Sequence, residues 1–172
     1  MNEAPDYAEP LQAWRAWKLV RRDGEYTLGS VVQRTLWPPG AALTAECLRC
    51  RHLLPRLRRK RCHDAPQSDC ECGIYAAALD RVGQYLVEAP CRGVSRVLGQ
   101  VALWGTVIEC ERGFRASHAY PSRMYIPSDA GKPWRAEWED VALDLWRYGV
   151  PIEPLAVAAT EAPRFLAERS AA

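Results

Sequence analysis

The sequence predicts a single domain of the α+β class over residues 1–172: a curved antiparallel sheet shaped like a partly open barrel, two or three helices and a zinc-clipped insertion. Three observations favour this class. They are a two-residue turn signal between apolar segments near the start, a long apolar alternation after residue 96, and segments whose apolar residues recur every three or four positions. A chain of 172 residues, 48% of them hydrophobic, is long enough for one such domain and short for two.

The first predicted element is a hairpin. Residues 11–20 have apolar side chains at both strand and helix spacings, and their two tryptophans favour a strand. Asp23-Gly24 is a strong two-residue turn signal, and residues 26–32 supply the returning strand. Pro38-Pro39-Gly40 ends regular structure, because proline lacks the donor that a sheet requires, and residues 41–46 are predicted as a third strand.

The strongest helical pattern covers residues 73–89, and Pro90 ends it. A second helix is predicted over 134–146, where tryptophan, valine and leucine recur every three to four positions before Gly149. Residues 155–166 are predicted as a last short helix, which a proline within them weakens. These segments are the two or three helices of the predicted class.

Strand patterns fill the region between these helices. Residues 97–110 alternate, with apolar side chains on both faces, which predicts a central strand. Gly99 and Gly105 within it indicate bulges or bends of the kind that curve a sheet toward a barrel. Glu111-Arg112-Gly113 predicts a hairpin turn, and the returning strand runs to Ile126.

Charge and hydropathy bear on location. The formal net charge is +2, which gives no overall attraction to nucleic acid or to an acidic membrane. The first residues lack an apolar core behind a basic start, and no segment approaches the roughly 20 apolar residues of a membrane span. We therefore expect a cytoplasmic protein that does not bind membranes.

Cysteine is concentrated in residues 47–73, the predicted zinc-binding segment, which holds five of the seven cysteines and two of the three histidines. Structural zinc takes four ligands, usually thiolates and imidazole, which arrive as two short clips. Cys70-Glu71-Cys72-Gly73 supplies one clip, with a glycine that lets the backbone fold closely around a metal. If the protein were exported, the same cysteines would predict a disulfide framework with one free thiol.

The other half of the site has more candidates than it needs. Our preferred set is Cys47, His63, Cys70 and Cys72, because the turn-forming residues after His63 bring it close to Cys70 and shorten the loop that binding must close. Either Cys50 or Cys62 is the alternative to His63. Cys62 and His63 are neighbours in the chain, so at most one of them binds the ion. The mixed thiolate and imidazole set favours Zn²⁺, since four thiolates would also suit iron.

A structural role for the zinc is predicted over a catalytic one. A catalytic site keeps one position for water and needs a nearby general base. Glu71 lies between two predicted ligands, but that position gives it no base geometry. The HxE and PCxxC pattern of zinc deaminases is absent as well, because His63 is followed by Asp64-Ala65 and the later clip is CxC.

The function predicted from these features is a non-enzymatic, zinc-stabilised binding or adaptor domain that recognises a protein or a nucleic acid through its basic loop or a sheet face. The basic residues between the cysteines could contact phosphates, although they serve equally well as a solvated loop without aromatic residues for base stacking. The five central ones are Arg56, Arg58, Arg59, Lys60 and Arg61.

An enzyme of unknown reaction is the alternative function. It would use Cys110 as nucleophile with His118 as base, or the metal site. No nucleophile elbow, phosphate-binding loop, zinc-protease or dinucleotide motif occurs in the sequence.

Overall fold

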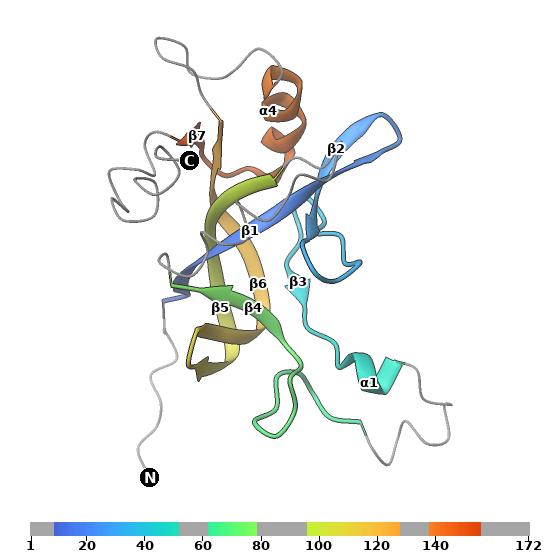
Figure 1. Ribbon diagram of the computed structural model, residues 1–172, viewed down its shortest axis with the longest axis vertical. Coiled ribbons are helices and arrows are strands. Elements are labelled where there is room, and N and C mark those ends of the chain that lie inside the picture. Colours follow the sequence, from blue (N-terminus) through green and yellow to red (C-terminus); the bar gives the residue numbers. More distant parts are fainter. Residues whose placement is uncertain (1–8, 52–61, 79–95, 128–137, 156–172) are drawn as a thin grey trace, which may run out of the picture.

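The computed structural model describes residues 9–51, 62–78, 96–127 and 138–155, and most of their regular structure is strand (Figure 1). The strands are β1 (Leu11–Arg22), β2 (Glu25–Ser30), β3 (Leu43–Thr44), β4 (Ile74–Ala77), β5 (Arg96–Cys110), β6 (Gly113–Ile126) and β7 (Ile152–Pro154), and the helical segments are α1 (Leu48–Arg51), α4 (Glu139–Leu145) and the 3-10 turn η2 (Trp146–Tyr148). All seven strands belong to one sheet.

Four of the strands pair in a closed circuit. β1 pairs with β5, β5 pairs with β6, and β6 pairs with β4, each antiparallel. β4 returns to β1 through the single pair of Trp14 with Ala77. Gly113 is needed where this circuit closes, since a Cβ there would lie 2.2 Å from the Ala76 carbonyl oxygen.

The two edges of β6 are occupied differently. β5 pairs along one edge over almost the whole strand. The other edge carries β4 opposite residues 113–116, β3 opposite 118 and 119, and the parallel β7 opposite 124–126. Between β4 and β3, the Ala45 amide donates to the Ser117 carbonyl at 2.7 Å. β3 and β4 therefore form one interrupted strand line along β6, which the chain leaves after Ala45 and rejoins at Ile74.

The predicted N-terminal hairpin is present. β1 and β2 pair from Trp17 with Ser30 down to Arg22 with Glu25. Asp23 and Gly24 have φ values of 53° and 90°, which are the two positive values that a type I′ turn requires. The predicted third strand is shorter than expected, with only Leu43–Thr44 in the sheet.

The long hairpin of β5 and β6 bends at two irregularities in its register. One lies between Gln100 and Val101, opposite Pro121, and the other between Trp104 and Val107. Gly105 lies inside the second with φ +75°, so the predicted bend at this glycine is confirmed. Pro121 fits within the ladder because it lies at the first irregularity, where regular pairing is already interrupted.

The predicted two or three helices are wrong for the described residues. The segment that begins the predicted 73–89 helix is strand β4, because its alternating burial matches the sheet period and β6 supplies the partner. The second predicted helix is helical in its described part, where α4 starts at Glu139 and passes into η2 at Trp146. Residues 79–95, 134–137 and 156–172, which hold the rest of the helical predictions, lie outside the described residues. Over the described ranges, the class is corrected to a sheet-rich fold with one short helix, α4, beyond the single turn of α1.

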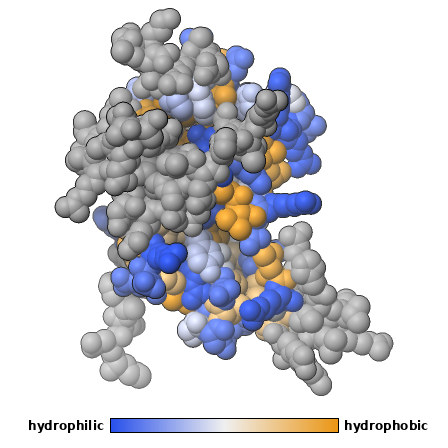
Figure 2. All heavy atoms as spheres, in the orientation of Figure 1, coloured by the Kyte–Doolittle hydropathy of each residue, from blue (hydrophilic) through white to orange (hydrophobic). Residues whose placement is uncertain are grey.

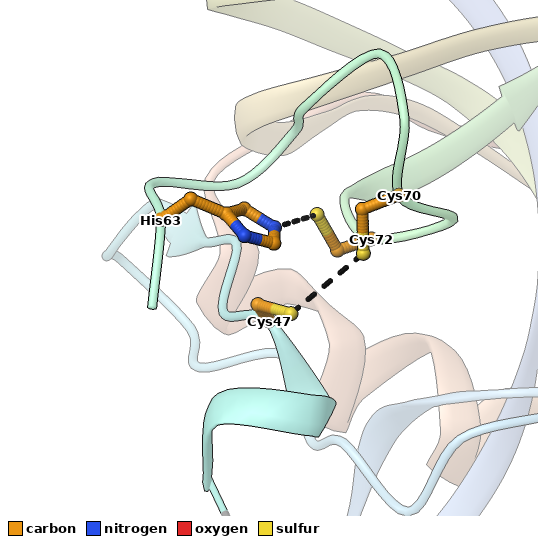
Figure 3. A group of neighbouring side chains, drawn as sticks. All are labelled: Cys47, His63, Cys70 and Cys72. Atoms are coloured by element: carbon orange, nitrogen blue, oxygen red, sulfur yellow. Dashed lines mark hydrogen bonds between the residues drawn. The ribbon is translucent and has the colours of Figure 1, made fainter. Parts of the chain in front are cut away.

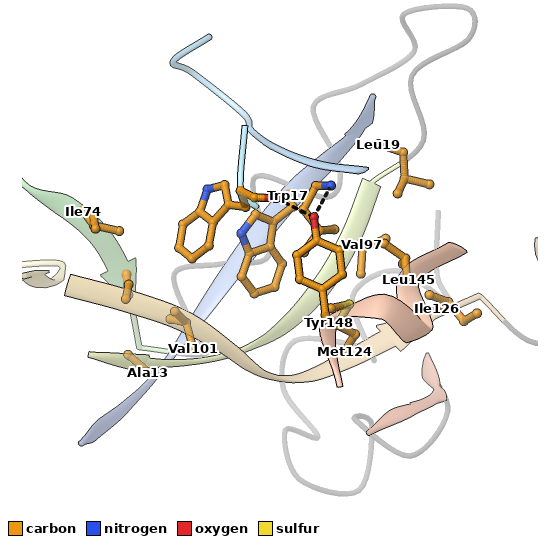
Figure 4. Close-up of a cluster of buried hydrophobic side chains, with 14 of the residues drawn as sticks. Ala13, Trp17, Leu19, Ile74, Val97, Val101, Met124, Ile126, Leu145 and Tyr148 are labelled. Atoms are coloured by element: carbon orange, nitrogen blue, oxygen red, sulfur yellow. Dashed lines mark hydrogen bonds between the residues drawn. The ribbon is translucent and has the colours of Figure 1, made fainter. Parts of the chain in front are cut away.

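The core lies between the sheet and α4 (Figure 4). Trp17 is fully buried and meets Trp37 edge to face, with ring centroids 5.5 Å apart. The Tyr148 hydroxyl accepts a hydrogen bond from the Leu28 amide at 2.9 Å and donates one to the Trp37 carbonyl at 2.6 Å. Burial raises the pKa of Tyr148 to about 12. The core thus fastens η2 to the first hairpin, at the end of the molecule opposite α1 (Figure 1).

Candidate metal centre

The structure brings together the four side chains predicted as metal ligands. One ligand atom from each of Cys47, His63, Cys70 and Cys72 lies within 4.8 Å of all the others, so the group is close enough to hold a metal ion. Figure 3 shows the imidazole ring and the three thiols pointing toward one another. The Sγ atoms of Cys47 and Cys70 are 3.8 Å apart, and His63 Nε2 is 3.2 Å from Cys72 Sγ.

These distances fit a tetrahedral centre. With metal–sulfur bonds of about 2.3 Å, two thiolates on one tetrahedral ion are separated by about 3.8 Å, which is the separation of Cys47 and Cys70. A nitrogen at about 2.0 Å from the ion would lie about 3.5 Å from each sulfur, a few tenths of an ångström beyond the observed contact of His63 with Cys72. The three cysteines are buried and His63 is half-buried, so the group is enclosed.

The cluster lies at the neck of the segment that leaves the sheet. Cys47 follows β3 by three residues, and Cys72 precedes β4 by two. Both strands pair with the same edge of β6. Cys47, after β3, and the CxC clip, before β4, therefore lie side by side although they are distant in the sequence. A bound metal would join the two halves of the interrupted strand line.

The backbone of the CxC clip depends on a glycine. Gly73 has φ +124°, and a Cβ there would lie 3.0 Å from Pro66 Cβ and 3.1 Å from Arg115 Cβ. The Cys70 amide donates to the Gln67 carbonyl at 3.2 Å, which closes the turn before the clip. The glycine expected next to the clip is therefore required by both its conformation and its close neighbours.

Arg115 of β6 is a part of the site that the sequence did not reveal. Its side chain is buried, and Nη1 donates to the carbonyls of Cys70 and Cys72, the latter at 3.1 Å. Nε donates to Cys110 Sγ at 3.2 Å. An arginine on an alternating strand is ordinarily solvated, so no pattern in the sequence indicated that this one is buried against the clip.

The choice among the remaining cysteines is resolved in part. Cys62 packs against the cluster, but it is outside the group of mutually close ligand atoms. The Cys50 side chain is outside the described part of the structure. His63 therefore completes the group in the described residues.

The thiols are held where ionisation is unfavourable without a cation. Burial raises the pKa of Cys72, and the neighbouring Cys70 and Cys47 raise it further. A coordinated cation reverses this balance, because it stabilises thiolates directly. Metal binding should thus release protons from the site.

Cys110 and His118 do not meet. Cys110 lies opposite Gly113 in the ladder and His118 lies opposite Trp104, so six strand positions separate them along β5. His118 Nδ1 instead lies 3.0 Å from Ser117 Oγ, and its ring stacks on Trp104. The geometry expected of a nucleophile and its base is absent from this pair.

Cavities adjoin the cluster on several sides, and two of them bear on its function. One, of about 510 Å³, lies beside His63 and is lined in part by Glu46, Asp64, Ser117 and His118. The other, of about 370 Å³, lies among β1, the end of β2 and β4, and its lining includes Trp14, Arg15, Val32, Glu71 and Tyr75.

The basic residues 56–61 lie outside the described residues, so their surroundings are not described. Among the described residues, no helix is long and apolar enough to span a membrane.

The fold and the cluster together define a class: a sheet-rich domain with a Cys₃His group at the neck of an insertion. Comparisons with protein-family models, with curated proteins and with solved structures found no match to this chain.

Proposed function

We propose that the protein is a non-enzymatic, cytoplasmic binding module that a structural Zn²⁺ stabilises and that recognises another macromolecule. The observation that carries the proposal is the position of the cluster, which joins the two halves of a strand line that the chain leaves after Ala45 and rejoins at Ile74. Four protein ligands, three of them buried thiols, suit a closed zinc site that leaves no position for water.

The cavity between β1 and β4 is the recognition surface that the described residues support best. Trp14 contributes to its lining, and two exposed apolar side chains lie beside it, Val32 at 80% and Tyr75 at 49% exposure. Arg15 adds a cation, which donates to the Tyr75 carbonyl and to Ser30 Oγ. An apolar cavity with a single positioned cation suits a protein segment better than a phosphate backbone. Figure 2 shows, on one face of the molecule, hydrophobic residues at the surface among hydrophilic ones.

The metal centre and this cavity share a wall. Glu71, between the two clip cysteines, lines the cavity, and the Tyr75 hydroxyl donates to the Glu71 carbonyl at 2.6 Å. Ordering the clip would thus order one side of the recognition surface. Nucleic-acid binding through residues 56–61 is the second form of the proposal, and it needs no apolar cavity.

An enzyme that uses the metal is the alternative function. The observation that favours it is the cavity beside His63, where His118, Asp64 and Glu46 gather near the cluster. That activity would require one of the four ligands to leave the ion and admit water.

Metal analysis of untagged protein, purified without added metal, tests the proposal. We expect one zinc per chain and seven free thiols under denaturing conditions. Cys72→Ser should lose the zinc, and Cys110→Ser, a cysteine outside the cluster, should keep it. Absence of metal, or disulfides among the cluster cysteines, would contradict the proposal.

The class of partner is tested by two titrations. Fluorescence anisotropy with DNA and RNA oligonucleotides at 50 and 200 mM salt should show a steep salt dependence if residues 56–61 contact phosphates. Peptides selected from a displayed library should lose binding in Tyr75→Ser if the cavity is used, while Leu143→Ser, an exposed residue on α4, serves as the control.

A further inference from the structure

We propose that Arg115 is the counter-cation and positioning residue of the metal centre: it holds the CxC clip in its metal-binding shape and balances the charge of the loaded site without touching the ion. This inference rests on the proposed zinc site, and it concerns how that site is stabilised within a fold that buries it.

Charge balance calls for such a residue. Zn²⁺ bound by three thiolates and a neutral imidazole carries a net charge of −1. All three cysteines are buried, and a buried charge without a partner costs several kcal/mol. Arg115 is 7% exposed, and it is the one charged side chain that is buried among the described residues. The site and its counter-charge are therefore buried together.

Hydrogen bonds hold the charged guanidinium of Arg115 against the backbone of the clip. Arg115 Nη1 donates to the carbonyls of Cys70 and Cys72 and, at 3.4 Å, to that of Gln67. Holding the first two carbonyls fixes the orientation of the peptide units on either side of Glu71. The two clip thiols are thereby aimed at one point before a metal arrives, which reduces the ordering that binding must impose.

The rest of the guanidinium is also held. Nε donates to Cys110 Sγ at 3.2 Å, and a guanidinium stays protonated in proteins, so the side chain remains a cation. On the ladder, Arg115 lies opposite Tyr75 of β4, directly beside the clip. β6 thus supplies both the strand that carries the two halves of the site and the charge that balances it.

Two substitutions separate charge from shape. Arg115→Lys keeps the charge but has one nitrogen, so it cannot hold the clip carbonyls and Cys110 Sγ together as Nη1 and Nε do, whereas Arg115→Met removes the charge and keeps most of the apolar stem. Arg112→Met is the matched control, because Arg112 is an exposed arginine in the turn of the same hairpin.

The experiment measures Zn²⁺ affinity by competition with a chromophoric chelator and records the absorption spectrum of the Co²⁺-substituted protein. We expect Arg115→Met to weaken Zn²⁺ binding about 10- to 100-fold, the range typical for outer-shell partners of metal ligands. Arg115→Lys should recover part of this loss but alter the Co²⁺ bands, since the clip is held differently. Arg112→Met should match the parent in both measurements.

Each outcome has a distinct meaning. Parent-like affinity and an unchanged Co²⁺ spectrum in Arg115→Met would overturn the role of Arg115 while leaving the zinc proposal intact. A parent protein that binds neither metal with all thiols reduced would overturn both. If Arg115→Met does not fold, Arg115→Lys decides, and a parent-like spectrum together with parent-like affinity in it would remove the positioning role.

Discussion

The two edges of β6 are built in different ways, although one strand presents both. Along one edge, β5 forms a ladder of many consecutive pairs within a single hairpin. Along the other, β4 contributes four residues and β3 only two, and a long excursion separates them. Short strand segments are weakly held by their own hydrogen bonds. The β5 edge is stabilised because both strands belong to one continuous hairpin. The edge that carries β3 and β4 needs a cross-link between its two short strands, which the Cys₃His group can supply.

Removing the metal is expected to have the largest effect, and to destabilise the edge of β6 that carries β3 and β4 while leaving the β5 edge stable. Treatment with a chelator, or Cys72→Ser, should abolish hydrogen-exchange protection in β3 and β4 while the amides shared by β5 and β6 stay protected. The reason is that coordination in structural zinc sites supplies about 10 kcal/mol or more, which becomes folding energy for the segments it joins. Leu143→Ser, at an exposed position on α4, is the control. Equal loss of protection on both edges would show that the metal supports the whole sheet.

Removing a large buried side chain from the core should instead destabilise both edges of β6 together. Trp17 is fully buried against Trp37, and Trp17→Ala is expected to cost about 3–5 kcal/mol in the free energy of unfolding by urea. Trp146→Ala, at a position that is 70% exposed, should change it by less than about 0.5 kcal/mol. A Trp17→Ala protein that lost only β3 and β4 would show that the core supports the interrupted edge alone.

The bend in the hairpin edge can be tested with a pair of glycines. Gly105 and Gly149 both have positive φ, which costs a substituted alanine about 1 kcal/mol. A Cβ at Gly105 would also lie 2.2 Å from Ser117 Oγ, whereas nothing lies within 4 Å at Gly149. We expect Gly105→Ala to cost about 2–3 kcal/mol and Gly149→Ala about 1 kcal/mol in thermal unfolding. Equal costs would mean that the hairpin absorbs the extra atom at its bulge.

The smallest expected effect concerns Tyr148, which lies far from the metal and binds the first hairpin. Tyr148→Phe removes two buried hydrogen bonds and should cost about 1–2 kcal/mol at neutral pH. Because the folded pKa of about 12 exceeds the unfolded value of 10.0, this tyrosine stabilises the fold fully below pH 10 and loses that contribution as the pH rises to 12. Urea titrations across this range should show the parent and Tyr148→Phe converging. Parallel curves would contradict the assigned pKa.

Local signals in the sequence predicted local structure well. Asp23-Gly24 can adopt a type I′ turn with little regard to the rest of the chain, and the structure has that turn. Gly105 indicated a bend, and the ladder is irregular there. The three cysteines and His63 that the spacing grouped lie close enough to hold one ion, because ligand spacing limits which side chains can reach a common point.

The error at residues 74–77 has a physical cause. Ile74 and Ala77 fit a helical face, and the same four residues also fit the alternation of a strand. Only the partner decides between the two, and that partner is β6, whose Gly113 allows β4 to approach closely. A helix prediction from one segment has no access to this contact.

By itself, the sequence determined the turns, the long hairpin and the set of side chains suited to a metal, because each depends on residues that are near one another in the chain. The tertiary structure alone decided that β1, β5, β6 and β4 close a circuit, that β3 and β4 share one edge of β6, and that Arg115 reaches the carbonyls of a clip some 43 to 45 positions earlier. These features depend on pairings between distant segments, whose stability comes from packing and burial that no local pattern records.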